Sequence, residues 1–259
     1  MQVHHKPTKI LIVGKSGSGK TTYLLRYIKH SEHAHVFIFD HKLEFQEREG
    51  IPVSCSIDEC VERLKKGEKY ISYHYAAEFP GDSETAFQFY SEWVFEVCKV
   101  LREDGKSRLF AADEVNRFTG TADMGWSFRQ LIEDGRLQGL DFIGTSHAAN
   151  QIHNRLRLQL SEIVALRTLD PRPLAFLEEN GFDPEAVKAL PTGAFIVKDL
   201  DTDEFTTGKL FSCAREKNEV IPREEQEPSP APPTPQEQDH ALSRPSENRS
   251  LPGGGSGPQ

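Results

Sequence analysis

Short apolar runs alternate with segments of helical spacing along most of the chain. The runs expected to form strands are Ile10–Val13, His35–Phe39, Tyr70–His74, Arg108–Ala112, Asp141–Thr145, Glu162–Arg167 and Ala194–Lys198. Several of them are apolar at consecutive positions, which is typical of parallel strands that are buried on both faces. The pattern therefore predicts a mostly parallel sheet.

Segments with apolar residues at helical spacing fill the gaps between these runs. The segments expected to form helices are Thr21–His30, Ser83–Leu101, Ser127–Gln138, Pro173–Asn180 and Asp183–Leu190. Residues 193–210 have the pattern of a β-hairpin that turns at Asp201–Asp203. Strands that alternate with helices in this way predict an α/β fold, with helices on both faces of the sheet and a hairpin at the C-terminal end.

The composition changes beyond about residue 217. Residues 221–259 are rich in proline, glycine and glutamate and contain no Phe, Tyr or Trp. Such a segment buries too little apolar surface to offset the entropy of ordering it. We therefore expect one domain over residues 1–216 and a disordered tail over residues 217–259, which is either a solvated end or an arm that docks on a partner.

Cysteine usage and hydropathy indicate the cellular compartment of the protein. The four cysteines form no CxxC pair, so they are expected to be buried packing residues, although Cys55 and Cys60 are near enough in sequence to pair under oxidation. No apolar run approaches the roughly 18 residues of a membrane span, and the N-terminus lacks the apolar core of a signal peptide. We expect a cytoplasmic protein without a membrane span.

One glycine-rich stretch matches a phosphate-binding loop over its full length. The match to G-x-x-x-x-G-K-[ST], between an expected strand and an expected helix, consists of Gly14, Lys15, Ser16, Gly17, Ser18, Gly19, Lys20 and Thr21, with Thr22 directly after it. Backbone N–H groups of such a loop point at phosphates, and the following helix adds its N-terminal partial charge. Lys20 is expected to reach the β- and γ-phosphates of ATP, and the Thr21 hydroxyl to bind Mg²⁺.

A second acidic motif follows the expected strand Arg108–Ala112. Asp113 is expected to hold Mg²⁺ through water, and Glu114 to orient and deprotonate the attacking water. The adjacent glutamate favours an NTPase that activates water over a kinase that excludes it. A signalling GTPase and an ABC-type ATPase are disfavoured because the chain has no NKxD-type or LSGGQ-like motif, whereas a small-molecule kinase and a nucleotide-gated binding module remain open.

The order of four segments, GKSGSGKT, VFIFDHKLEF, RLFAADEVN and GRLQGLDFIGTSHAANQI, resembles the HerA–FtsK superfamily of DNA-translocating ATPases. Within it, the chain is similar over about residues 8–200 to the genome-packaging ATPases of tailless icosahedral viruses with internal membranes. The narrower likeness rests on DHKLEF, from Asp40 to Phe45, which is similar to the family's D-P-x-G-E-Y, and on Gly135-Arg136 before the next strand.

The resemblance implies a RecA-like core, a homo-oligomer in the form of a hexameric ring, and double-stranded DNA as the translocated partner. It implies ATP-driven packaging of viral DNA into a preformed capsid, with capsid or packaging-vertex proteins as further partners, in the host cytoplasm or at the vertex of the virion. A Zot-like assembly ATPase of filamentous phages is the alternative within the superfamily, although those proteins usually carry a membrane span.

The resemblance also implies roles for individual residues. Arg136 is expected to act as an arginine finger on a neighbouring subunit's site, with Arg129 and then Arg155 as the next candidates. A surface ion pair of Arg136 with Glu133 or Asp134 is the plainer reading. Where the family usually has Thr-Gln, this chain has Thr145-Ser146-His147, so the γ-phosphate sensor would be Ser146 or His147.

Contacts with DNA are expected from loops and basic side chains. The net charge of −9 argues against a globally basic nucleic-acid binder but leaves room for a basic channel. A ring would make pore candidates of Arg117, Phe118 and the glycine-flanked loop Gly120–Gly125, although such a loop is as well read as a solvent-exposed connection. The further candidates for contacts with DNA phosphates are Arg102, Lys106, Arg155 and Arg157.

Overall fold

The structure is a computed structural model and describes residues 8–210 of the chain. The expected tail over residues 217–259 and Cys213 lie outside the described residues. Within that part the strands are β1 (Lys9–Val13), β2 (His35–Phe39), β3 (Val53–Ser54), β4 (Tyr70–Tyr73), β5 (Arg108–Ala112), β6 (Leu140–Ser146), β7 (Glu162–Leu166), β8 (Ala194–Asp199) and β9 (Phe205–Lys209).

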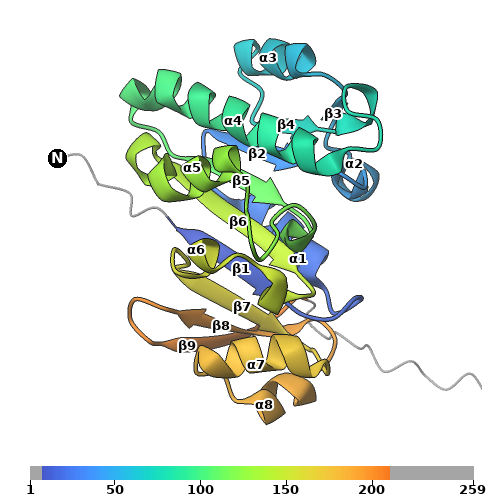
Figure 1. Cartoon of the computed structure of the whole chain (residues 1–259), viewed down its shortest axis with the longest axis vertical. Coiled ribbons are helices and arrows are strands. Elements are labelled where there is room, and N and C mark those ends of the chain that lie inside the picture. Colours follow the sequence, from blue (N-terminus) through green and yellow to red (C-terminus); the bar gives the residue numbers. More distant parts are fainter. Residues whose placement is uncertain (1–7, 211–259) are drawn as a thin grey trace, which may run out of the picture. The chain divides into compact units, whose positions relative to one another are not determined.

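All these strands belong to one sheet with the order β3-β4-β2-β5-β6-β1-β7-β8-β9 (Figure 1). Neighbouring strands from β3 to β7 pair in parallel, whereas β8 and β9 form an antiparallel hairpin on the β7 edge. The expected α/β class, the mostly parallel sheet and the hairpin are therefore confirmed. Strand β6 lies between β1 and β5, which brings the ends of these three strands together.

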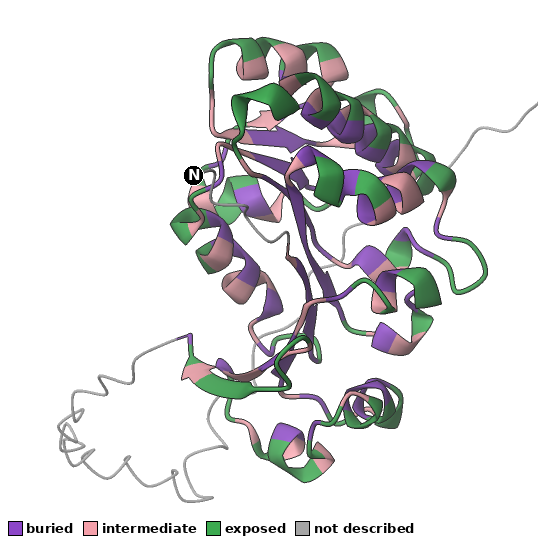
Figure 2. Cartoon of the chain, turned by 90° about the vertical axis from the view of Figure 1, so that its left-hand side faces the viewer, coloured by how far each residue is buried: buried purple, intermediate pink, exposed green. Residues whose placement is uncertain are grey.

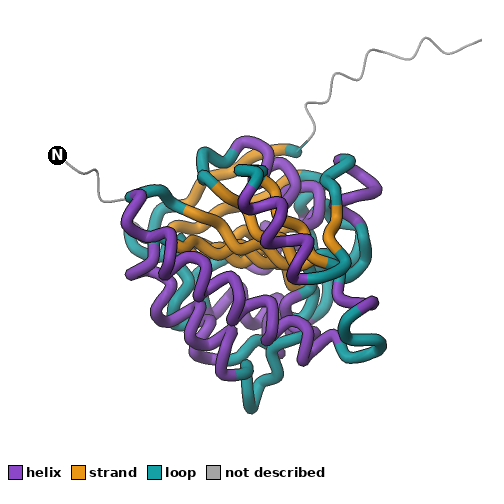
Figure 3. The backbone as a smooth tube through the Cα atoms, turned by 90° about the horizontal axis from the view of Figure 1, so that it is seen from above, coloured by secondary structure: helices purple, strands orange, loops and turns teal. Residues whose placement is uncertain are grey.

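The α-helices of the described part connect the strands. They are α1 (Lys20–His30), α2 (Glu44–Glu49), α3 (Ile57–Lys65), α4 (Ser83–Leu101), α5 (Trp126–Asp134), α6 (Asn154–Arg157), α7 (Pro171–Glu179) and α8 (Pro184–Ala189). Figure 3 shows the strands as a layer with helices on both of its sides.

Strand β1 shows why the runs in the sequence lack polar alternation. Ile10 and Ile12 pack into one core with residues of α1 and α2, whereas Leu11 and Val13 pack into a second core with residues of α4 and α5. The strand is buried on both faces, and the central strands are correspondingly coloured as buried in Figure 2. Burial on both faces favours apolar side chains at consecutive positions, here from Ile10 to Val13.

Four of these strands and α-helices were not predicted from the sequence: α2, β3, α3 and α6. The start of α3 does carry a readable signal, because Ser56 accepts a hydrogen bond from the Glu59 N–H (3.2 Å) and Glu59 Oε2 accepts one from the Cys55 N–H (2.7 Å). This reciprocal pattern is close to a capping box, and the spacing Ser56-x-x-Glu59 is typical of that motif.

Two further predictions are wrong. The helix expected over Ser127–Gln138 is two elements, because α5 ends at Asp134 and a 3₁₀ turn, η4 (Gly135–Gln138), follows. Cys55, expected to be buried, is exposed, whereas Cys60 and Cys98 are buried as expected. No helix in the described residues is long and apolar enough to cross a membrane.

Because β1, β2, β5, β6 and β7 are parallel, their carboxyl ends share one edge of the sheet. Ligands of open α/β sheets bind outside this edge. The phosphate-binding loop follows β1, the DHKLEF turn follows β2, and the acidic pair follows β5. The fold therefore gathers the motifs that the sequence singled out.

Candidate nucleotide site

The glycine-rich loop between β1 and α1 adopts a backbone path that requires glycine. Gly17 and Gly19 have φ angles of +73° and +109°, in the left-handed region that side chains disfavour. A Cβ atom on Gly19 would also lie 2.8 Å from Cδ1 of Leu210. The loop is held to the neighbouring strands, since the Gly14 N–H donates to the Ser146 carbonyl (3.3 Å) and the Lys15 N–H to that of Arg167 (3.0 Å).

Lys20 begins α1 and lies largely buried at the base of this loop. Its Nζ donates a hydrogen bond to the carbonyl of Lys15 (3.0 Å), so the ammonium points across the loop. Burial lowers the pKa of Lys20, and the negative charges of Asp113 and Glu114 partly oppose this effect. The side chain is placed to meet phosphate oxygens that the loop cradles.

Thr145, at the end of the intervening strand β6, orients both acidic residues. Its hydroxyl donates a hydrogen bond to Oδ1 of Asp113 and accepts one from the Glu114 N–H (3.0 Å). The Thr21 hydroxyl donates to the other carboxylate oxygen, Oδ2 of Asp113 (3.3 Å). One hydroxyl and one carboxylate facing a phosphate loop are the oxygen ligands that Mg²⁺ takes alongside substrate phosphates, so these residues fit the ion.

Glu114 lies under three basic side chains and has a left-handed backbone, with φ of +51°. Lys42 Nζ is 2.6 Å from Oε1, Arg117 NH1 is 3.3 Å from Oε2, and His41 Nε2 is 3.7 Å from Oε2. Partial burial alone would raise the pKa of Glu114, but the hydrogen bond and charge of Lys42 outweigh it and hold that pKa below its usual value.

His41 is a neutral neighbour of this carboxylate. Burial, together with the positive charge of Lys42, lowers the pKa of His41 to about 4. The ring packs edge-on against Phe118, with 5.2 Å between ring centroids. His41 Nε2 has no hydrogen-bond partner within the described part of the chain, although its buried edge faces Glu114. It therefore adds no charge to the site at neutral pH.

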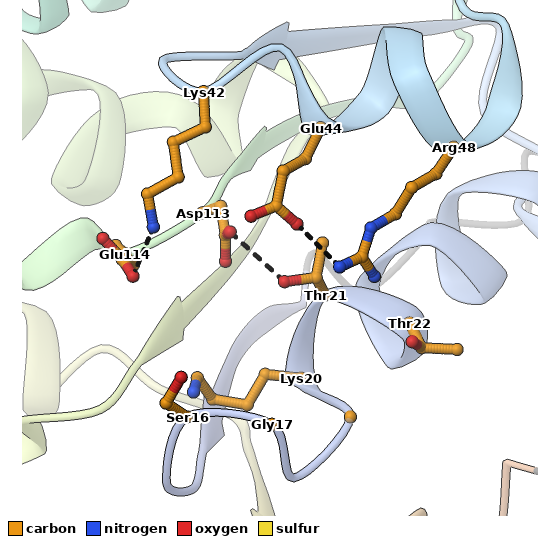
Figure 4. A pocket seen from close by; sticks show the side chains of 11 residues that line it. Ser16, Gly17, Lys20, Thr21, Thr22, Lys42, Glu44, Arg48, Asp113 and Glu114 are labelled. Carbon is orange, nitrogen blue, oxygen red and sulfur yellow. Dashed lines mark hydrogen bonds and ion pairs between the residues drawn. The ribbon is translucent and has the colours of Figure 1, made fainter. Parts of the chain in front are cut away.

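The phosphate-binding loop, Lys42 and the acidic pair line one polar cleft of about 270 Å³ (Figure 4). Its walls come from the phosphate-binding loop, from the turn and helix after β2, and from the end of β5, and consist of Ser16, Gly17, Gly19, Lys20, Thr21, Thr22, Lys42, Glu44, Arg48, Asp113 and Glu114. Figure 4 shows Lys42 reaching down to Glu114 and Arg48 turned toward Glu44, its ion-pair partner at 3.2 Å. The cleft positions of Lys42, Glu44 and Arg48 were not predicted from the sequence.

The DHKLEF turn places Lys42 above the cleft. Asp40 is buried and its Oδ2 accepts hydrogen bonds from the N–H groups of Phe45 (3.2 Å) and Gln46 (3.4 Å), which fixes the start of α2. Burial raises the pKa of Asp40 to about 6, although these backbone bonds oppose the shift. Leu43 has φ of +61°, a left-handed conformation at the position where the resembled motif has glycine.

The sensor candidates lie beside the cleft. Ser146 is fully buried, and its hydroxyl donates to Asn116 Oδ1 (2.9 Å) and accepts from the Ala148 N–H (3.0 Å). His147 is exposed. Neither residue lines the cleft, so a sensor role for either stays a prediction.

The arginine-finger candidates differ in their pairing. Glu133 forms ion pairs with both Arg129 (3.0 Å) and Arg155 (2.9 Å). Arg136 is exposed on η4, and no ion pair of Arg136 occurs within residues 8–210. The alternative interpretation, an ion pair of Arg136 with Glu133 or Asp134, is therefore not seen in this part of the chain, and the role of Arg136 as a finger stays a prediction.

One pore candidate is wrong, and one candidate for contacts with DNA phosphates is constrained. Phe118 is buried and stacks on Phe87 with 4.8 Å between ring centroids, so it belongs to the core. Arg157 donates to the Ala149 carbonyl (3.1 Å) and lies over the Phe176 ring, which is a structural role. The loop Gly120–Gly125 is mainly exposed and remains a candidate, as do Arg102 and Lys106, which are exposed before β5 begins.

A parallel sheet with a phosphate-binding loop after β1, and with an acidic pair after β5 beyond one intervening strand, is the fold of the P-loop NTPases. Comparison with solved structures supports this class. The genome packaging NTPase B204 of Sulfolobus turreted icosahedral virus 2, in complex with AMPPCP, is similar with a TM-score of 0.63 and 16% sequence identity, over 79% of this chain and 98% of that chain.

Two other solved structures have the same fold. B204, the DNA-packaging ATPase of Sulfolobus turreted icosahedral virus, is similar with a TM-score of 0.58 and 16% identity, over 79% of this chain and 98% of that one. The cytoplasmic domain of the type VII secretion ATPase EccC of Thermomonospora curvata is similar with a TM-score of 0.54 and 18% identity, over 78% of this chain and 25% of that one. No family model matches the chain. No curated protein matches it either.

Proposed function

We propose that this protein is an ATPase that translocates double-stranded DNA and packages a viral genome into a preformed capsid. The observation that carries the enzymatic part is Glu114, a carboxylate at the mouth of a phosphate-binding cleft, directly after the Mg²⁺-binding candidate Asp113. The similar fold of a genome packaging NTPase, solved in complex with AMPPCP and with ATP-gammaS, supports ATP as the nucleotide and genome packaging as the process.

In this mechanism the protein positions three groups around the triphosphate. Lys20 and the loop N–H groups hold the β- and γ-phosphates, while Thr21 and Asp113 hold the ion. Mg²⁺, when bound, neutralises charge on these phosphates. Glu114 orients a water molecule and takes its proton as the water oxygen bonds to the γ-phosphorus and the bond to the β–γ bridging oxygen breaks.

The coupling to DNA rests on assembly. A γ-phosphoryl group spreads charge over three equatorial oxygens in the transition state, and Lys20 serves the β–γ side. We propose a homo-oligomer, a hexameric ring, in which Arg136 of one subunit reaches the cleft of the next. DNA in the ring would be held through its phosphates, without sequence preference and with steep salt dependence.

The test is the rate of ATP hydrolysis with and without duplex DNA over a series of protein concentrations. We expect turnover to rise with concentration as rings form and to rise further with duplex DNA. Stimulation should be independent of DNA sequence and should fall as salt is raised. ATPase activity that DNA leaves unchanged at every concentration would remove translocation from the proposal. A phosphorylated small molecule as product would identify a kinase instead.

A further inference from the structure

Lys42 is a cation of the cleft outside the phosphate-binding loop, and it pairs with the proposed catalytic base. Its Nζ lies 2.6 Å from Oε1 of Glu114, and its side chain is 35% exposed against 21% for Glu114. The same side chain lines the cleft together with Lys20 and Thr21. A phosphate held in this cleft therefore enters within reach of the Lys42 ammonium.

The backbone that carries Lys42 is fixed, whereas its side chain can change partner. Asp40 fastens the backbone of α2 on one side of the turn, and Leu43 holds a left-handed conformation directly after Lys42. The ion pair itself is partly exposed to water, and pairs of that kind contribute little to stability. A γ-phosphate carries more charge than one carboxylate, so it competes well for the ammonium.

The pairing also affects the chemistry of Glu114. Lys42 Nζ lies 2.6 Å from Oε1 of Glu114, and Arg117 NH1 lies 3.3 Å from Oε2. With both oxygens engaged, the carboxylate is a weaker acceptor for the proton of a water molecule than it is after Lys42 leaves. Ser146 and His147, the residues expected to sense the γ-phosphate, do not line the cleft. Apart from the loop, Thr22 and the acidic pair, the lining residues are Lys42, Glu44 and Arg48, and Arg48 is paired with Glu44.

We propose that Lys42 is a positioning residue that exchanges partners with the state of the nucleotide. With an empty cleft or with ADP, Lys42 binds Glu114 and keeps the base engaged. With ATP, the γ-phosphate binds the Lys42 ammonium. Oε1 of Glu114 then becomes available to activate the attacking water. This inference rests on the proposed ATPase function and identifies the group in this chain that distinguishes a triphosphate from a diphosphate.

The first test compares the dissociation constants of ADP and of a non-hydrolysable ATP analogue, each with Mg²⁺, by titration calorimetry. Lys42→Met should weaken binding of the analogue about tenfold and leave ADP within twofold of the wild type, which also shows that the variant is folded. Lys42→Arg should keep the preference for the analogue within about threefold. Lys65→Met, which removes another partly exposed lysine paired with a glutamate at 2.9 Å, is the matched control and should change neither constant.

Two results of this titration would overturn the proposal. One is a Lys42→Met variant that binds the analogue as tightly as the wild type, and the other is an equal loss for both nucleotides. A wild-type protein that binds neither nucleotide would instead refute the proposed ATPase function, and the inference with it. The two failures are thus distinguished by the wild-type titration alone.

The second test is a pair of crystal structures, one with Mg²⁺ and ADP and one with Mg²⁺ and the same ATP analogue. With ADP, Lys42 Nζ should stay within hydrogen-bond distance of Glu114. With the analogue, Lys42 Nζ should lie within hydrogen-bond distance of a γ-phosphate oxygen and should have left the Glu114 carboxylate. An unchanged Lys42–Glu114 pair in both structures would refute the exchange.

Discussion

The hydroxyl of Thr21, on the first turn of α1, lies 3.3 Å from Oδ2 of Asp113, although 92 residues separate them in sequence. The contact exists because β1 and β5 run parallel on either side of β6, so that the phosphate-binding loop and the acidic pair end at the same edge. It defines the point at which two motifs that are distant in sequence become one site.

Loss of the Lys20 ammonium should abolish nucleotide binding. The Lys20 ammonium lies at the base of the loop and is directed at the β- and γ-phosphates of a bound nucleotide. Lys20→Ala therefore removes the main positive charge that pairs with these phosphates. In a thermal melt, the wild type should gain stability with an ATP analogue and Mg²⁺, whereas Lys20→Ala should show no shift. Lys29→Ala, at an exposed position late in α1, serves as control and should shift like the wild type.

Replacement of Glu114 by glutamine should separate binding from turnover. The amide keeps the shape of the side chain but cannot take the proton of the attacking water, so Glu114→Gln should bind ATP and hydrolyse it at least about a hundredfold more slowly. Glu185→Gln, which removes an exposed carboxylate paired with Lys188 at 2.6 Å, should keep the wild-type rate. A wild-type rate in Glu114→Gln would show that another group activates the water.

Thr145 should matter through its hydroxyl alone. Valine has nearly the same shape, but Thr145→Val leaves Oδ1 of Asp113 and the Glu114 N–H without the partner that orients them. We expect turnover to fall about tenfold or more, together with a loss of about 1–3 kcal/mol in the free energy of unfolding, because both groups stay largely buried. Thr206→Val, on exposed strand β9, should change neither quantity.

An arginine that acts across a subunit interface should permit complementation. Arg136→Ala and Lys20→Ala proteins should each lack ATPase activity, and mixing them should partly restore it, because each contributes its intact half to a shared site. Arg172→Ala, which removes an exposed arginine paired with Asp170, should be active by itself. Full activity of Arg136→Ala at concentrations where rings form would move the assignment to Arg129.

The buried carboxyl of Asp40 should make stability depend on pH. Burial raises its pKa in the folded protein to about 6, above the usual value of 3.8. The folded state therefore binds this proton more tightly than the unfolded state does, so the contribution of Asp40 to stability is full at low pH and is lost as pH rises through about 6. The difference in free energy of unfolding between the wild type and Asp40→Asn should fall by on the order of 2 kcal/mol between pH 4 and pH 7. Parallel stability curves for the two proteins would contradict this.

The parts of the site that could be predicted are those whose functional residues are consecutive in the sequence. The residues from Gly14 to Thr21 carry both the glycines and the lysine that the loop needs, and Asp113-Glu114 directly follows an apolar strand. The sheet could be predicted for a similar reason, because a strand such as β1 is buried on both faces and every one of its positions is constrained.

The rest depends on geometry that no local pattern carries. Lys42 meets Glu114 only because the turn after β2 folds over the end of β5, and Thr145 reaches both acidic residues only because β6 lies between β5 and β1. Gly135 ends α5 although the helical spacing continues to Gln138. Phe118 packs into the core although it lies in the same loop as the exposed pore candidates. Tertiary packing decided each of these cases.

The left-handed backbone of Leu43 raises the question of what holds the turn after β2 in place. Glycine is the residue that this conformation favours, yet the turn persists here with a leucine, since Asp40 holds the following helix by its backbone N–H groups. The nearby Asp40 carboxylate therefore fixes the turn without a glycine at position 43. A search for this turn by its glycine would therefore overlook the chain, whereas a search by main-chain conformation would find the turn.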